Sequence, residues 1–349
     1  MFIASELRRR RKAAPTQPRT CSEQSHAARR LSGPVWTFAL FLRRIGHGVA
    51  AMIVSASRRT DIPALHWAWF MDRLRHGVCS VANPRNPSIV SSISLRPEDV
   101  DAIVFWSKNP APMLPFVREI EAINPRFYVL FTLNDYPLDL EPAMPPVAER
   151  VAVFSRLSDM IGPARVVWRY DPIVLSSRTD ADYHRLRFER LCGQLRTRTE
   201  RVIVSVVDMY GSTRRALKRL ESRGWRFSPD PAADPSLPGL LRDISGMAAA
   251  AGIAIQSCAE DARVNACGIR PGACIDSELI RRLWGRCADP RKDPAQRPAC
   301  LCAVSRDIGM YGTCSHGCVY CYAGGADARV RCGSADLPHE HGCTGEVRP

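Results

Sequence analysis

Short apolar runs alternate with longer amphipathic segments from Met52 onward. Runs rich in Val, Ile and aromatic residues are typical of buried strands, whereas apolar positions three and four residues apart indicate helices. The predicted strands are Ile53–Ser57, Ala102–Trp106, Phe127–Thr132, Arg165–Arg169, Val202–Val207 and Ile253–Ser257, with Leu301–Ser305 as a candidate seventh. The predicted helices are Leu65–Arg75, Met113–Ile123, Val147–Met160, Ala181–Leu195, Thr213–Glu221 and Leu237–Ala251.

This alternation predicts the fold class. Parallel neighbouring strands need a crossover connection, so strands that alternate with helices indicate a parallel sheet. We therefore expect an α/β protein with a single parallel β/α barrel, closed or partly open, of six to eight strands, over residues 52–323. Residues 78–94 break the rhythm with two short strands around an Asn-Pro turn, which predicts a hairpin insertion.

The two ends of the chain differ from its centre in composition. Residues 1–51 hold ten Lys and Arg against two Asp and Glu, a net of +8, which leaves +6 of the total +14 for residues 52–349. We expect residues 1–51 to be a disordered basic extension or a mis-assigned start, and residues 324–349 to be a disordered tail rich in Gly and charge. No apolar run is long enough to cross a membrane, and no ordinary secretory signal is present, which favours the cytoplasm.

Polar residues follow each predicted strand at the end where β/α barrels place their chemistry. Arg58 and Arg59 follow the first strand and Lys108 the second, and Asp171 and Glu260 follow later ones. Each could be a solvated loop residue or a helix cap. However, paired guanidinium groups suit a carboxylate or a phosphate, and a Lys that points into a barrel mouth needs an anion. We therefore treat these five residues as candidate contacts to a cofactor or substrate.

Cysteines are the strongest chemical signal in the chain. Disulfide scaffolds are usually short, so a chain of 349 residues with fourteen cysteines in a reducing compartment is interpreted first as a metal or iron–sulfur protein. Cys314, Cys318 and Cys321 form the densest group, which we call the triplet. Three thiolates from one loop can bind three irons of a [4Fe–4S] cluster, and the fourth iron stays open to chelate S-adenosylmethionine and pass it one electron.

Two resemblances add to this interpretation. The triplet, with Tyr320 just before its last cysteine, resembles the signature of the radical S-adenosylmethionine superfamily. The resemblance implies a full or partial β/α barrel, cluster ligation by the triplet and contact of Tyr320 with the adenine. It also implies an electron donor such as flavodoxin or ferredoxin. In that superfamily, however, the triplet follows the first strand, whereas here it follows the last predicted one. A circular permutation, with Leu301–Ser305 beside Ile53–Ser57, would account for this difference.

The second resemblance covers residues 52–323 and is to a bacterial family known only as domain of unknown function 1848, which implies no activity. The matching segments are Ser55–Pro63, Phe105–Pro110, Arg169–Pro172, Ser257–Glu260, Gly272–Asp276, Lys292-Asp293 with Gln296-Arg297, and Ser305–Ala323.

Four further cysteines lie within the cysteine-rich segment 258–323. They are Cys258, Cys274, Cys300 and Cys302, which we call the tetrad. Four thiolates can bind a second iron–sulfur cluster or a tetrahedral zinc ion. Because Cys-x-Cys is less usual for zinc than Cys-x-x-Cys, the spacing favours iron slightly. We expect the isolated cysteines, Cys79, Cys192 and Cys287, to be ordinary small side chains.

We therefore expect an iron–sulfur enzyme of radical S-adenosylmethionine type, whose substrate the sequence does not disclose. Two alternatives stay open. One is a zinc-stapled module without catalytic activity that binds nucleic acid, which the modest charge of +6 over residues 52–349 does not favour. The other is an electron-transfer protein with two clusters.

Overall fold

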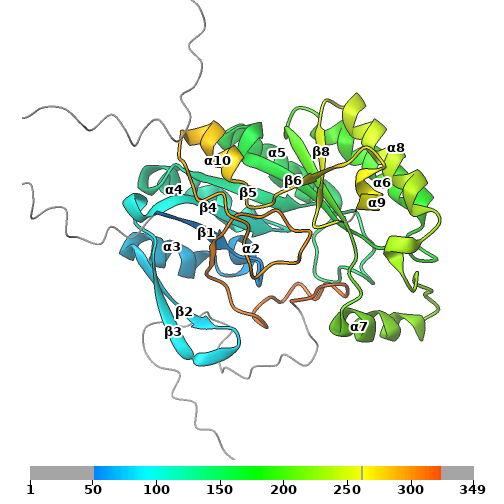
Figure 1. The fold of residues 1–349 in the computed structure, drawn as a ribbon, viewed down its shortest axis with the longest axis horizontal. Helices are drawn as coiled ribbons and strands as arrows, with labels where there is room; N and C mark the ends of the chain where they lie inside the picture. Colours follow the sequence, from blue (N-terminus) through cyan, green and yellow to red (C-terminus); the bar gives the residue numbers. More distant parts are fainter. Residues whose placement is uncertain (1–50, 261, 324–349) are drawn as a thin grey trace, which may run out of the picture. The chain divides into compact units, whose positions relative to one another are not determined.

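A large parallel sheet is the centre of the fold (Figure 1). The computed structural model describes residues 51–260 and 262–323, so the expectations for residues 1–50 and 324–349 lie outside it. The sheet has eight strands in the order β10-β1-β4-β5-β6-β7-β8-β9, and all neighbours are parallel. The strands are β1 (Met52–Ala56), β4 (Val100–Ser107), β5 (Phe127–Thr132), β6 (Val166–Ile173), β7 (Arg201–Val206), β8 (Ala254–Cys258), β9 (Arg270–Gly272) and β10 (Arg306–Asp307).

The mixed α/β fold with a parallel sheet is confirmed, and six of its strands lie where the sequence predicts them. The two outer strands differ. Leu301–Ser305 is wrong as a strand, because pairing with β1 begins only at Arg306. β9 was not predicted, since Arg270-Pro-Gly272 has no apolar period and extends only because it pairs with β8. Within the described residues no ladder joins β9 to β10.

Helices follow the strands much as predicted. They are α2 (Ile62–Leu65), α3 (Trp67–His76), α4 (Val117–Ile123), α5 (Val147–Ile161), α6 (Ala181–Leu195), α7 (Gly211–Glu221), α8 (Leu237–Ala250), α9 (Ala262–Asn265) and α10 (Ser277–Trp284). The start of α6 has a clear local cause, because the Asp180 carboxylate accepts a hydrogen bond from the Tyr183 amide at 2.9 Å. The helix predicted over Met113–Ile123 is α-helical only from Val117, because residues 111–116 form a 3₁₀ helix that contains Pro115, which has no amide hydrogen to donate.

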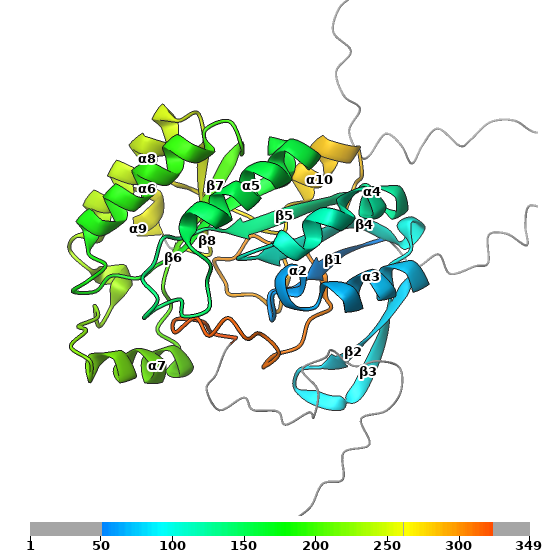
Figure 2. The ribbon, with the colours of Figure 1, turned by 180° about the vertical axis from the view of Figure 1, so that it is seen from behind.

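The predicted hairpin is confirmed. Strands β2 (Val78–Asn83) and β3 (Asn86–Ser94) pair antiparallel, and the Asn83 side chain accepts a hydrogen bond from the Arg85 amide at 2.9 Å within the turn. In Figures 1 and 2 the hairpin extends away from the sheet, and most of β3 is exposed. It is therefore an insertion that adds little to the core.

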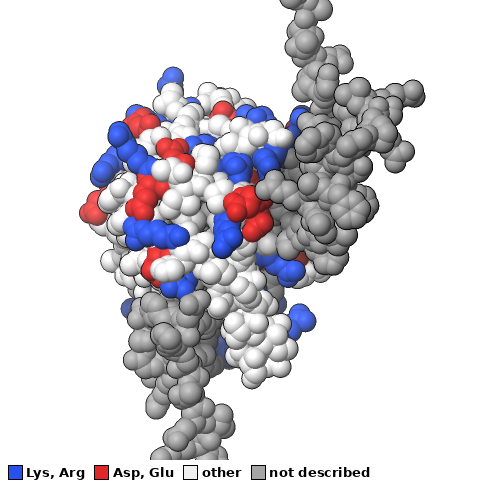
Figure 3. Space-filling model, turned by 90° about the vertical axis from the view of Figure 1, so that its left-hand side faces the viewer, with Lys and Arg blue, Asp and Glu red and all other residues white. Residues whose placement is uncertain are grey.

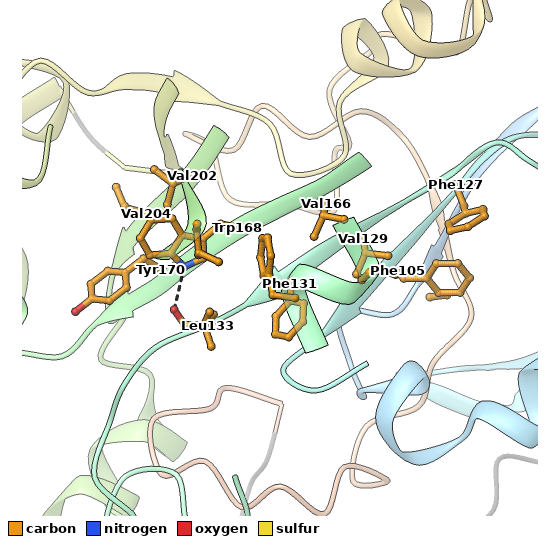
Figure 4. Packing of buried hydrophobic residues seen from close by; sticks show 14 of the residues in the cluster. Phe105, Phe127, Val129, Phe131, Leu133, Val166, Trp168, Tyr170, Val202 and Val204 are labelled. Atoms are coloured by element: carbon orange, nitrogen blue, oxygen red, sulfur yellow. Dashed lines mark hydrogen bonds between the residues drawn. The ribbon is translucent and has the colours of Figure 1, made fainter. Parts of the chain in front are cut away.

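The two faces of the sheet bury different partners. One face packs against α3, α4, α5, α6 and α8 through alternate strand residues such as Phe105, Phe131 and Trp168 (Figure 4). The Trp168 indole donates a hydrogen bond to the Leu133 carbonyl at 2.9 Å, so its polar atom is satisfied inside this cluster. Side chains of this size contribute about 1.5–3 kcal/mol each when they are fully buried.

The opposite face is covered by the C-terminal part of the chain. Ile53, Val104 and Leu130 pack there against α10 and against the segment that carries Cys300 and Cys302. Tyr128 fastens this cover to the sheet, because its hydroxyl donates to the Cys274 carbonyl at 2.7 Å and accepts from the Asp276 amide at 3.1 Å. The stretches around Cys274 and around Cys300 and Cys302 are therefore part of the core.

All strands end at the same edge of the sheet because they are parallel. In both Figure 1 and Figure 2, residues 305–323 run past this edge, between the β2–β3 hairpin and α7. A ring contact agrees with this placement, since Tyr322 lies 6.2 Å from Tyr210 at the start of α7. Among the residues that the structure describes, no helix is long and apolar enough to cross a membrane.

Candidate functional site

The triplet lies in an irregular loop after β10. Cys314, Cys318 and Cys321 are half-buried, and the Cys321 amide donates to the Cys318 carbonyl at 3.1 Å. Burial raises the pKa of the Cys318 thiol to about 12, and the charges of the other two cysteines act in the same direction. The charges of Cys314 and Cys321 therefore reach the Cys318 thiol.

Polar side chains from the strand ends hold this loop in place. His316 forms a hydrogen bond with the Asp61 carboxylate at 2.8 Å, and Asp61 also caps α2 and accepts from the Lys108 amide at 2.7 Å. His66 contacts the Thr313 carbonyl at 3.0 Å. The loop is thus tied to the residues after β1 and β4.

Tyr320 is part of a buried polar cluster. The Lys108 ammonium donates to the Glu141 carboxylate at 2.7 Å and to the Tyr320 hydroxyl at 2.8 Å, and Tyr320 also contacts Glu141. Burial alone would raise the pKa of Glu141, but the charges of Lys108 and Arg150 outweigh it and lower that pKa. Two predicted site residues, Lys108 and Tyr320, therefore lie together with their polar groups directed at Glu141.

Arg58 and Arg59 surround Asp307 in β10. The Asp307 carboxylate accepts hydrogen bonds from Ser55, Ser57 and the Arg58 amide at 2.9, 2.6 and 2.8 Å. The guanidinium of Arg59 lies 3.9 Å from Asp307, and that of Arg58 lies 3.8 Å from a second carboxylate, Asp293.

A close backbone approach supports this contact between β1 and the chain after β10. A Cβ on Gly309 would lie 2.1 Å from the Ser57 hydroxyl oxygen, so only glycine fits. The Arg59 guanidinium donates to the Gly309 carbonyl at 3.1 Å, and the Tyr322 hydroxyl donates to the Arg58 carbonyl at 2.9 Å. The arginine pair is therefore built into the attachment of the triplet loop.

Asp171 and Glu260 lie farther along the same edge. Asp171 pairs with Arg169 and accepts from the Ser205 hydroxyl at 2.5 Å. Glu260 accepts from the Val206 amide at 2.8 Å, at the end of β7. The Arg169 guanidinium also stacks over Trp106, 4.7 Å from the ring centre. Each predicted strand-end residue therefore has a protein partner.

The tetrad is a separate, more deeply buried group. Cys274, Cys300 and Cys302 are at most 4% exposed, and the sulfurs of Cys258 and Cys274 are 3.4 Å apart. The pKa of Cys302 is lowered because the thiols of Cys274 and Cys300 donate hydrogen bonds to its sulfur, and Arg58 adds a positive charge. The pKa of Cys300 is raised because its thiol is the donor. The structure therefore places the four cysteines in one buried cluster, with the sulfurs of Cys258 and Cys274 in contact.

Both groups have the donor chemistry that an iron–sulfur cluster or zinc requires, since thiolates are ligands of both. In residues 51–260 and 262–323, however, no three His, Cys, Asp or Glu side chains are arranged as they stand to hold a metal ion.

The three isolated cysteines do not all behave as the sequence predicts. Cys79 and Cys192 are buried, as expected, whereas Cys287 is disulfide-bonded, so the expectation for Cys287 is wrong.

A surface depression of about 600 Å³ lies beside the triplet loop, which contributes Val319 to its lining. It is lined by Leu138, Asp139, Pro142, Leu220, Arg223 and Val319. None of the predicted site residues lines it. We therefore place the candidate site at the strand ends and not in this depression.

Sequence reasoning missed the anionic partners in the site. Glu141, Asp293 and Asp307 hold Lys108, Arg58 and Arg59, but each lies far along the chain from its cation. The contact of His316 with Asp61 likewise depends on residues far apart in the sequence. The only available signal was the location of Asp293 and Asp307 within the segments that carry the family resemblance.

Comparison with known proteins identifies the family. The sequence model of domain of unknown function DUF1848 matches residues 53–323, which is more than half of the chain. No curated protein and no solved structure matches the chain. The match spans the whole sheet and both cysteine groups. The chain therefore belongs to the DUF1848 family.

Proposed function

We propose that this protein is an iron–sulfur enzyme of the radical S-adenosylmethionine type. The triplet would hold a [4Fe–4S] cluster through three irons, and the strand ends would bind S-adenosylmethionine and an unidentified substrate. The observation that carries the proposal is the place of the triplet loop, which is fixed to Asp61, Lys108 and the Arg58 carbonyl at the carboxyl edge of a parallel sheet. Parallel α/β folds bind their ligands at this edge.

When bound, a cluster with one open iron supplies the electron for reductive cleavage of S-adenosylmethionine. The chain's own residues position the loop that would carry it. Tyr320, between Cys318 and Cys321, is held by Lys108 and Glu141, and His316 is held by Asp61. Each cysteine of the triplet is at most two residues from Tyr320 or His316, so the contacts of these two side chains restrict where the thiols can lie.

The residues proposed to contact the cofactor are Arg58, Arg59, Lys108, Asp171, Glu260 and Tyr320. In the structure their charges are balanced by protein groups, such as Glu141 for Lys108 and Arg169 for Asp171. We propose that S-adenosylmethionine, which carries an amino group, a carboxylate and a sulfonium, exchanges with some of these partners.

We also propose that the sheet is a circularly permuted form of the barrel used by that superfamily. β10, which directly precedes the triplet loop, pairs in parallel with β1. In a permuted barrel this strand takes the place of the first one, so the cysteine loop follows the equivalent strand.

The nucleic-acid alternative finds no specific support. On the face in Figure 3, Lys and Arg side chains are interspersed with Asp and Glu side chains in the described part. Arg58 and Arg59, which would have to grip phosphates, face Asp293 and Asp307.

The test is anaerobic purification of the full chain, followed by iron and sulfide analysis. We expect a brown protein with about four irons at the triplet. Reduced by dithionite, flavodoxin or ferredoxin, it should convert S-adenosylmethionine to 5′-deoxyadenosine. A colourless protein without iron after anaerobic reconstitution would overturn the proposal.

A further inference from the structure

The tetrad lies where the chain after β9 meets the chain before β10, and these are the two outer strands of the sheet. Cys258 ends β8 and Cys274 follows β9, whereas Cys300 and Cys302 precede β10 at the opposite end of the strand order. The segments meet directly, because the Ala303 amide donates to the Ile275 carbonyl at 3.0 Å. In the described part of the chain, no hydrogen-bonded ladder joins β9 and β10. We call the boundary between these two ends of the sheet the seam, and the tetrad spans it.

Short contacts link the four cysteines across this seam. The sulfurs of Cys258 and Cys274 lie 3.4 Å apart, and the Cys302 amide lies 3.5 Å from the Cys300 sulfur. The Ile275 amide also points at the Cys302 sulfur, 3.4 Å away. Four cysteines from three separate segments therefore share one small, buried space.

The spacing of the sulfurs distinguishes one metal ion from a cluster. Zinc–thiolate bonds of about 2.3 Å in a tetrahedron place the sulfurs about 3.8 Å apart. A [4Fe–4S] cluster needs each thiolate on a different iron, at the outside of a cube, so its sulfurs cannot touch. The 3.4 Å contact between the sulfurs of Cys258 and Cys274 is close to the first spacing, whereas a cluster would require these two sulfurs to separate.

Three guanidinium groups face the tetrad. Arg58 acts on Cys302, Arg169 on Cys258 and Cys274, and Arg297 on Cys258. Four thiolates around one divalent cation carry a net charge of −2, which is costly to bury unless it is compensated. Each of these guanidinium groups is also paired with a carboxylate, of Asp293, Asp171 or Asp208, so only part of its positive charge is available to such a complex.

We propose that Cys258, Cys274, Cys300 and Cys302 bind one zinc ion, which fastens the β8–β9 end of the sheet to the segment before β10. Zinc binds the cysteines as thiolates, so binding releases the protons that the thiols still carry, and the sulfurs turn towards one centre. This site is independent of the triplet and goes beyond the proposed enzymatic function. It also reverses the slight preference for iron that the Cys-x-Cys spacing suggested.

The test is metal analysis of the full chain in which Cys314, Cys318 and Cys321 are all replaced by Ala. We expect about one zinc per chain and no iron, with X-ray absorption showing four sulfurs at about 2.3 Å. Iron with sulfide in place of zinc would overturn the proposal, as would a disulfide between Cys258 and Cys274 with no metal. Because the triplet is absent from this variant, failure of the enzymatic proposal does not affect the result.

A second measurement guards against variants that do not fold. Addition of Co²⁺ to the apo form of the same triplet variant should give the visible bands of a tetrahedral cobalt thiolate at one equivalent. Cys302→Ser should lose these bands, and Cys192→Ala, which changes a buried cysteine in α6, should keep them. If Cys302→Ser does not fold, the cobalt spectrum of the triplet variant alone decides, and absence of thiolate bands there contradicts the proposal.

Discussion

The two cysteine groups differ in what holds them. The tetrad lies in the layer that covers one face of the sheet, the sulfurs of Cys258 and Cys274 touch, and its residues come from three stretches between Cys258 and Cys302. The triplet lies in one short loop, half-buried, and polar side chains such as Asp61 and Lys108 fix that loop to the strand ends. A metal in the first position would stabilise the fold, whereas a metal in the second would be open to a ligand. The comparison separates a structural role from a catalytic one.

The largest expected effect is the difference between substitution of a triplet cysteine and substitution of a tetrad cysteine. Replacing Cys318 by Ala should abolish 5′-deoxyadenosine formation and reduce iron content, while the free energy of unfolding changes by less than about 1 kcal/mol. Replacing Cys274 by Ala should instead lower the thermal midpoint strongly, because it removes a link across the seam. Iron analysis and thermal unfolding of both variants check this. Equal destabilisation by the two changes would contradict the division of roles.

Glu141 is the next most sensitive position. Glu141→Ala leaves the buried cations Lys108 and Arg150 without their carboxylate, which should cost about 3–5 kcal/mol. Urea unfolding measures this loss, and Glu141→Gln, which keeps the shape and some hydrogen bonding, should cost less. A value below about 1 kcal/mol for the Ala variant would show that this cluster does not secure the triplet loop.

A substitution at Gly309 tests whether the triplet loop depends on its close approach to the end of β1. A Cβ there would overlap the Ser57 side chain, so Gly309→Ala should cost about 1–3 kcal/mol. Gly193→Ala in α6 is the matched control, because no atom lies within 4 Å of its added Cβ and Ala favours a helix by up to about 1 kcal/mol. The two variants should therefore shift urea unfolding in opposite directions.

The smallest expected effect is a change in the free energy of unfolding at acid pH. The pKa of Glu141 is lowered in the fold, so the unfolded chain binds a proton at a higher pH than the folded chain does. This carboxylate therefore contributes stability above its ordinary pKa, and the contribution is lost as pH falls through the lowered value. The difference in unfolding free energy between the wild type and Glu141→Gln should shrink below about pH 4.5. A difference that grows on acidification would contradict this sign.

The sequence predicted the inner strands and most helices because their residues carry a strong apolar period. β9 and β10 were missed or misplaced, since Arg270-Pro-Gly272 and Arg306-Asp307 are extended only through pairing with β8 and β1. The same limit applies to the site. Cysteine spacing indicated both groups, but the partners Glu141 and Asp307 are ordinary acidic residues until the sheet brings them to Lys108 and Arg59.

The most direct test of the enzymatic account is electron paramagnetic resonance of the reduced protein with and without S-adenosylmethionine. An open iron on the triplet cluster predicts a reduced [4Fe–4S] signal that changes when S-adenosylmethionine is added, and loss of that signal in Cys318→Ala. A cluster signal that the cofactor leaves unchanged, or no cluster signal after reconstitution, would contradict the central claim.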